Sequence, residues 1–199
     1  MANEQISRKL KIRYILFLII LFVLPALSLY FLNSGKNYRM QALQEMKEYG
    51  KVEDFQLKNQ RGIDLSPQMF RGKVTVACLL PENPDSAAFY TERLSIIHES
   101  YDDTKDVIFL SFLNSSDSTN LLEKAKQLGI TDHDQWWLLR SEDNEKARQL
   151  YHFPKEGQFQ IALADTSLMV RKHYNIYDNR QMGRLVEHIA LIIPEQPRR

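Results

Sequence analysis

Cysteine is nearly absent from this chain, which has one, Cys78, among its 199 residues. A single thiol excludes an intramolecular disulfide framework, so the fold must be stabilised by its hydrophobic core. It also excludes thiol–disulfide exchange within the chain, because that reaction needs a resolving thiol beside the nucleophile. Cysteine and histidine do not occur at the spacing of a zinc site either, and we predict no metal and no cofactor.

An excess of charge is also absent, because 26 basic and 25 acidic side chains leave a net charge of +1. Nucleic-acid binding usually requires a basic surface that neutralises phosphates. No run of basic residues alternates with aromatic residues after the N-terminal segment. We therefore predict no nucleic-acid partner.

One long hydrophobic run is present, from Tyr14 to Leu32, and it contains no charged side chain. A helix rises about 1.5 Å per residue, so this run roughly matches the hydrocarbon core of a bilayer. Basic residues are more frequent before the run than after it: Arg8, Lys9, Lys11 and Arg13 against Lys36 and Arg39. The positive-inside rule then predicts a cytoplasmic N-terminus and a domain on the extracytoplasmic, periplasmic side of the inner (cytoplasmic) membrane.

A cleaved signal peptide is the alternative to a membrane anchor. Its nearest small-x-small cleavage site, Ala26-Leu27-Ser28, lies within the apolar run, which is also long for a signal peptide. We therefore predict an uncleaved, single-pass anchor. The predicted organisation is a cytoplasmic N-terminus (1–13), the anchor (14–32), a linker with a short amphipathic helix (33–51), a domain (52–193) and a tail (194–199).

The chain after the linker alternates predicted strands and helices. Apolar runs predict buried strands at 74–80, 106–113 and 135–139, and two hairpins are predicted at 54–65 and 158–174. Helices are predicted from Pro84, from a Ser118 or Thr119 cap to Leu128, from a Ser141 cap to Tyr151, and over 182–193. This order implies an α/β sandwich around a mixed sheet.

The domain opens with a motif, Asp54-Phe55-x-Leu57 followed by Gly62, Leu65 and Phe70-x-Gly72-Lys73-Val74. Together with the element order and the anchor, this opening resembles the thioredoxin-like superfamily, and most closely its SCO family of membrane-anchored cytochrome c oxidase assembly proteins. The motif is shared with peroxiredoxins, whereas the long helix after the loop and the closing hairpin and helix favour SCO. The resemblance covers residues 52–193. It implies an α/β, thioredoxin-like fold with an N-terminal β-hairpin, preceded by a single transmembrane helix.

The resemblance also implies where a copper site would lie. SCO proteins bind copper through a Cys-x3-Cys pair after the first core strand and a distant His before the terminal hairpin. On this chain the pair falls on Asn83 and Ala87, and the His falls near Gly157 to Phe159; the closest histidine is His152. We therefore expect a degenerate member with no catalytic, cofactor-binding or metal-binding residue carried over from the family.

Other side chains have structural interpretations. Cys78 lies in an apolar run and is expected to be a small buried hydrophobe with a raised pKa. His98 and His188 are expected on exposed or half-buried helix faces, and His133 in a solvated loop. The basic cluster at 171–173 is expected to form a solvated face, with anionic lipid or an acidic partner as the alternatives.

Three functions follow from these observations. The first is a membrane-anchored SCO-like protein, not an enzyme, that acts through protein contacts in respiratory oxidase assembly, with oxidase subunits or assembly factors as partners. The second is a binding or structural module of the envelope that is unrelated to oxidases. The third is a divergent single-cysteine thiol peroxidase or reductase that uses Cys78.

Overall fold

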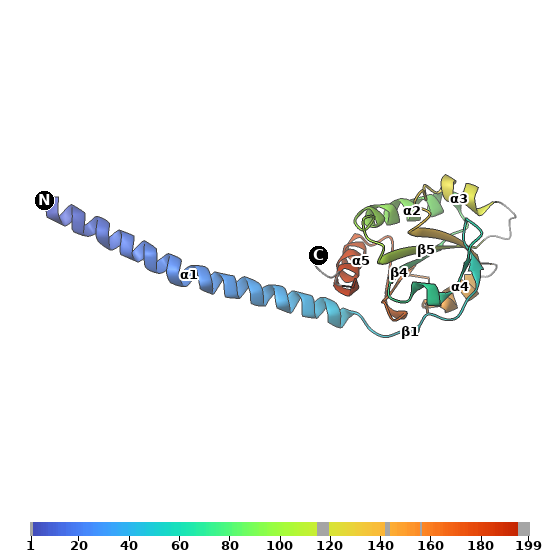
Figure 1. The fold of residues 1–199 in the computed structure, drawn as a ribbon, viewed down its shortest axis with the longest axis horizontal. Helices are drawn as coiled ribbons and strands as arrows, with labels where there is room; N and C mark the ends of the chain where they lie inside the picture. Colours follow the sequence, from blue (N-terminus) through green and yellow to red (C-terminus); the bar gives the residue numbers. More distant parts are fainter. Residues whose placement is uncertain (1, 115–119, 142–143, 156, 195–199) are drawn as a thin grey trace. The chain divides into compact units, whose positions relative to one another are not determined.

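The computed structural model describes residues 2–114, 120–141, 144–155 and 157–194, and the chain folds as two compact units that meet in sequence at residue 45. The first unit is a single long helix, α1 (Ala2–Glu45), shown in Figure 1. Its stretch Arg13–Glu45 is long and apolar enough, by length and composition, to cross a membrane. The amphipathic helix expected after the anchor is a continuation of this same helix.

The second unit is built on a six-stranded mixed sheet with the order β1-β8-β7-β4-β5-β6. The strands β4 (Val74–Leu80), β5 (Val107–Asn114) and β6 (Trp136–Ser141) are parallel, as expected of strands joined through helices. The strands β7 (Ile161–Ala164), β8 (Met169–Tyr174) and β1 (Gly50–Lys51) continue the sheet in antiparallel pairs. A separate hairpin, β2 (Leu57–Lys58) with β3 (Asp64–Leu65), precedes the 3₁₀ helix η1 (Pro67–Phe70).

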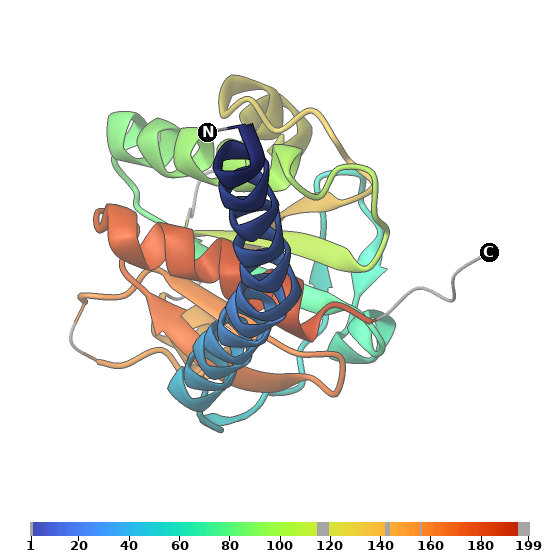
Figure 2. The ribbon, with the colours of Figure 1, turned by 90° about the vertical axis from the view of Figure 1, so that its left-hand side faces the viewer.

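Both faces of the sheet are buried, which explains why β4 is a continuous apolar run. Successive side chains of a strand point to opposite faces, and β4 supplies Cys78 to one core and Ala77 to the other. The Cys78 core is covered by α2 (Pro84–Glu99) and α5 (Asn179–Ile192), which lie on the same face of the sheet in Figure 2. The Ala77 core includes Phe70 of η1 and Tyr151, which follows α4 (Asn144–Leu150).

The predicted strands, hairpins and helices are confirmed, with corrections at their ends. Helix α3 (Leu121–Gln127) begins after Asn120, whose side chain accepts the Leu122 N–H; the expected caps Ser118 and Thr119 lie outside the described residues. Ser141, the expected cap of α4, is the last residue of β6, because the strand extends further than its apolar core; residues 142–143, between it and α4, lie outside the described residues.

Candidate functional site

The loop after β4 and the first turn of α2 hold Asn83 and Ala87, the positions at which the resemblance to the SCO family places that family's thiols. Asn83 is the N-cap of α2, and its Oδ1 accepts the Ser86 backbone N–H at 3.0 Å. Pro84 follows at the first helical position, where its fixed φ fits and its missing N–H costs nothing. Ala87 is one turn further along and is 1% exposed, so its methyl group belongs to the core. Both positions are therefore filled by residues that serve the local structure.

These residues do not fit copper. An amide that caps a helix and a buried methyl group offer neither the soft thiolates nor the imidazole that copper prefers. In the loop where the histidine ligand was expected, near residues 157–159, the Gln160 side chain donates to the Gly157 carbonyl at 2.9 Å. Among the described residues, no group of three or more His, Cys, Asp or Glu is placed to hold a metal ion.

Cys78 lies two residues before the end of β4 and is 0% exposed. It lies between Ser111 of β5 and Ile161 of β7 in the sheet. Burial raises the pKa of its thiol far above the ordinary value, because a thiolate is poorly solvated in an apolar core. The expectation that Cys78 is a small buried hydrophobe is confirmed.

An aromatic surface is formed by Phe89 and Tyr90, which lie on the same helix as the expected thiol positions, and by Tyr177, from the turn between β8 and α5. The rings of Phe89 and Tyr177 stack at 5.6 Å, and the Tyr90 hydroxyl donates to that of Tyr177 at 3.1 Å. Phe89 is 37% exposed and Tyr177 is 59% exposed. The Arg93 guanidinium lies 5.8 Å from the Phe89 ring and donates to Asn179 at 2.7 Å. Sequence reasoning missed this surface, because Tyr177 meets α2 only through the fold.

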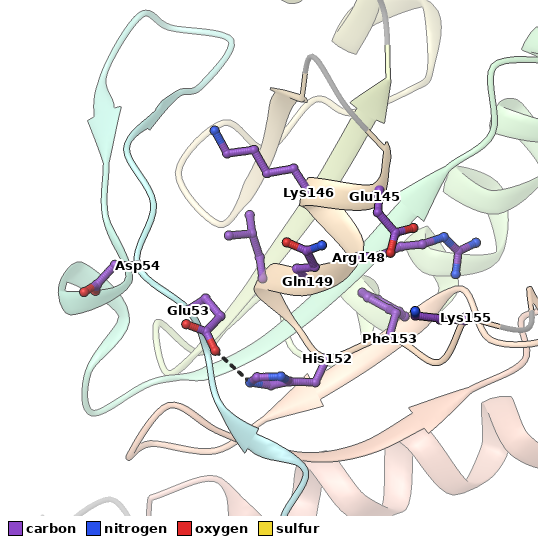
Figure 3. Close-up of a pocket in the computed structure, with 10 residues that line it drawn as sticks. Glu53, Asp54, Glu145, Lys146, Arg148, Gln149, His152, Phe153 and Lys155 are labelled. Atoms are coloured by element: carbon purple, nitrogen blue, oxygen red, sulfur yellow. Dashed lines mark ion pairs between the residues drawn. The ribbon is translucent and has the colours of Figure 1, made fainter.

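A pocket of about 550 Å³ opens at the C-terminal end of α4. Figure 3 shows Glu53 and Asp54 on one side of it, and His152 at the end of the helix beside Glu53. The other lining residues are Glu145, Lys146, Arg148, Gln149, Leu150, Phe153 and Lys155. His152, the histidine closest in sequence to the expected ligand position, thus lies at this pocket, with its Nε2 at the Lys51 carbonyl.

The remaining histidines differ in their outcomes. His98 is half-buried as expected and lies 3.1 Å from Asp132, and His133 contacts Gln60 at 3.1 Å. The expectation for His188 is wrong: its side chain is 0% exposed, and its Nδ1 lies 2.7 Å from the Tyr174 hydroxyl. Burial lowers the pKa of His188, because the charged imidazolium is disfavoured there.

The solvated face expected at 171–173 is also wrong. Lys172 pairs with Glu45 at 2.6 Å and Arg171 pairs with Glu48 at 3.2 Å, so both cations are partly covered. His173 is buried and its Nε2 donates to the Tyr151 carbonyl at 2.9 Å. Arg171 and Lys172 thus pair with Glu48, after α1, and Glu45, the last residue of α1, both in the segment that the sequence pattern assigned to a linker.

No protein-family model matches the chain, and no curated protein matches its sequence. Its fold, however, matches solved structures. BsSco, a member of the Sco family of cytochrome c oxidase assembly proteins, is 18% identical with a TM-score of 0.57, over 73% of this chain and 95% of BsSco. A SCO1/SenC family lipoprotein from Bacillus anthracis is 22% identical with a TM-score of 0.59, over 72% of this chain and 95% of the lipoprotein.

A thiol peroxidase from Chromobacterium violaceum also matches, at 13% identity and a TM-score of 0.53, over 72% of this chain and 86% of the peroxidase. At such identities the likeness establishes the fold alone. The thioredoxin-like fold expected from the sequence is thereby confirmed.

Proposed function

We propose that this chain is a membrane-anchored, SCO-like protein that acts through protein contacts in respiratory oxidase assembly, without thiol or copper chemistry of its own. Two of the structures that share its fold are Sco-family proteins, one of them named as a cytochrome c oxidase assembly protein. The helix α1 is a candidate membrane anchor. Because a fold alone does not define a function, the proposal depends on the residues at the site.

The replacement of the thiol positions by Asn83 and Ala87 carries the proposal. Asn83 stabilises the start of α2 and Ala87 packs beneath it, so the scaffold is maintained without the donors that would do chemistry. Near this end of α2, the aromatic surface exposes the stacked rings of Phe89 and Tyr177 to solvent. Aromatic side chains are enriched in protein–protein interfaces, and we propose that an oxidase subunit or assembly factor contacts this surface.

A deletion strain complemented with variants of the full chain tests this function. We expect the deletion to lower the amount of assembled oxidase, measured from its haem absorbance in membranes, and the wild-type chain and Cys78→Ala to restore it. Phe89→Ser with Tyr177→Ser should fail to restore it. The matched control is Ile63→Ser with Met69→Ser. These side chains are similarly exposed, at 43% and 49%, but lie on the hairpin side of the domain.

Each alternative function has its own outcome in this experiment. An unchanged oxidase content in the deletion strain would favour an envelope module with no tie to oxidases. Loss of complementation by Cys78→Ala, with the protein present at normal amounts, would favour a thiol peroxidase or reductase. The burial of Cys78 and its raised pKa argue against that last alternative, because thiolate and access are what such an enzyme needs.

A further inference from the structure

The connecting segment, residues 45–52, leads from the last residue of α1 past β1 and belongs to the second compact unit. Its backbone N–H groups bond to β8 and to the residue before β8: Lys47 donates to residue 171 at 2.9 Å, Tyr49 to residue 170 at 3.0 Å and Val52 to residue 168 at 2.8 Å. These bonds lie at an edge of the sheet, where β1 contributes only two residues. A segment held by few bonds at an edge can open without the rest of the domain.

Ion pairs add to these backbone bonds. Glu45 lies 2.6 Å from Lys172 of β8 and 3.2 Å from Arg184 of α5, and Glu48 lies 3.2 Å from Arg171 of β8. Carboxylates ordinarily titrate at about pH 4, so these pairs persist between pH 5.5 and 7.5. Any response of the segment to pH in this range must therefore come from histidine.

Two buried histidines contact the connecting segment, and the first is His188 of α5. Its side chain is 0% exposed, its Nδ1 lies 2.7 Å from the Tyr174 hydroxyl, and its Nε2 lies 3.8 Å from a Glu45 carboxylate oxygen. Among the described residues, Nε2 has no hydrogen-bond partner. Charged groups of three elements surround the ring: Glu45 of the connecting segment, Lys172 of β8, and Arg184 and Glu187 of α5. Burial and the two cations outweigh the two carboxylates and lower the pKa of His188.

The second buried histidine is His173 of β8. Its Nε2 donates to the Tyr151 carbonyl at 2.9 Å, which places the proton of the neutral ring on Nε2. Its Nδ1 is buried and has no hydrogen-bond partner in the part of the chain that the structure describes. The Tyr49 ring of the connecting segment packs against it, with ring centroids 4.6 Å apart. Further neighbours are Phe153, Phe159 and His152. Burial lowers the pKa of His173 against the opposing effect of the Tyr151 carbonyl, and His152 lowers it further.

We propose that the connecting segment is a pH-sensitive latch, which lies on β8 and α5 while His173 and His188 are neutral and detaches when acid protonates them. Once the segment has moved away, water solvates an imidazolium that the packed segment excludes. Each histidine then binds its proton more tightly in the open state, so a fall in pH shifts the equilibrium toward that state. Fully extended, residues 45–52 reach about 26 Å, so release lengthens the tether between α1 and the sheet. This switch is independent of the proposed role in oxidase assembly.

The linkage between proton binding and opening sets the size of the effect. A histidine that takes its proton only in the open state, with a pKa of about 6.5 there, raises the opening constant about tenfold between pH 7.5 and 5.5. Two such histidines raise it by up to about a hundredfold. The measurement must therefore resolve a tenfold change in local opening.

Hydrogen exchange measured by mass spectrometry, on the full chain in a nonionic detergent, tests the latch at pH 7.5 and 5.5. Protection factors, which correct for the pH dependence of the exchange chemistry itself, are compared for the amides of residues 47–52 and of β4. We expect those of the connecting segment to fall at least about tenfold at pH 5.5. They should then also be at least about tenfold below those of β4, because the segment opens without the sheet.

Variants assign the effect to the two histidines. His173→Gln with His188→Gln removes both titrations, and the fall in protection between the two pH values should shrink to less than about twofold. The matched control is His98→Gln on α2, which removes a histidine that lies 3.1 Å from Asp132 and should keep the wild-type fall. Each comparison is made between two pH values of one protein, so a general loss of stability does not imitate the result. If the double variant does not fold, the single variants give the same test, each with a smaller fall than the wild type.

Three results would overturn the latch. The first is protection of the connecting segment that does not change between pH 7.5 and 5.5. The second is protection equal to that of β4 at pH 5.5, which would show that the segment opens only when the whole domain unfolds. The third is a full pH effect in the histidine variants, which would assign it to other groups.

Discussion

At the scale of single residues, the burial of a polar side chain depends on partners that are distant in sequence. Cys78 was predictable, because it stands in an unbroken apolar run whose burial needs no further information. The burial of His188 was not predictable, because the residues that contact its side chain, Tyr174 and Glu45, come from β8 and from the end of α1. A polar residue on a helix face can be buried when other elements supply its contacts, and sequence periodicity does not reveal them.

We predict that Cys78 is inert in the folded protein. Its side chain is buried and burial raises the pKa of its thiol, so both access and thiolate are lacking. In the native full chain, iodoacetamide labelling followed by mass spectrometry should be at least about a hundredfold slower than in denaturant, where the ordinary thiol pKa near 8.5 returns. Rapid native labelling at neutral pH would contradict the buried position and revive the peroxidase alternative.

The burial of His188 predicts that acid destabilises the protein. Its pKa is lowered from 6.5, first by burial and then by Lys172, against the opposing attraction of Glu45 and Glu187. As pH falls below 6.5, the unfolded chain binds a proton at this residue before the folded chain does, so the free energy of unfolding decreases. Tm should therefore be lower at pH 5.5 than at pH 7.5.

His188→Gln provides the control for this pH dependence. Glutamine retains a group that can reach the Tyr174 hydroxyl but does not titrate. The loss of Tm between pH 7.5 and 5.5 should therefore be smaller in the variant. It should not vanish, because burial also lowers the pKa of His173. An identical loss in both proteins would show that His188 does not contribute.

At the scale of elements, the hydrophobic pattern of the chain was sufficient to predict the strands and helices whose burial is continuous. The runs that form β4, β5 and β6, the start of α2 at Pro84 and the periodicity of α5 could all be predicted. The strand β1 could not, because two residues, Gly50 and Lys51, carry no hydrophobic pattern. They pair with β8 through backbone groups, which the side-chain sequence does not encode.

The start of α2 gives a prediction at this scale. Asn83→Ala removes the acceptor for the Ser86 N–H and should lower the free energy of unfolding by about 1 kcal/mol, the usual effect of losing an N-cap. Asn83→Asp should be close to neutral, because a carboxylate both caps the helix and interacts well with its N-terminal dipole. Denaturant unfolding of the full chain in detergent measures both; an Ala variant as stable as wild type would refute the capping role.

At the scale of the whole molecule, the sequence predicted the fold class but not the surfaces. The order of strands and helices indicated a mixed sheet covered on both faces, which is the architecture found. The aromatic surface and the α4 pocket each join residues that are tens of positions apart in the chain. Neither could be found before the sheet order brought their elements together.

The proposed topology has a direct test. If α1 anchors the chain with its N-terminus in the cytoplasm, alkaline phosphatase fused to the C-terminus should be active, because that enzyme needs the oxidising periplasm to form its disulfides. A green fluorescent protein fused at the same position should be dark, because it would be exported in unfolded form. A dark phosphatase fusion and a bright fluorescent one would place the domain in the cytoplasm.

We propose, centrally, that Asn83 and Ala87 fill the thiol positions of a thioredoxin-like scaffold, so that the chain does no copper chemistry. Competition for Cu(I) against a chromophoric chelator, with the purified full chain in detergent, measures it most directly. We predict that the wild-type chain leaves the metal with the chelator, whereas Asn83→Cys with Ala87→Cys withdraws about one equivalent, because paired thiolates select Cu(I). Stoichiometric withdrawal of Cu(I) by the wild-type chain would contradict the account.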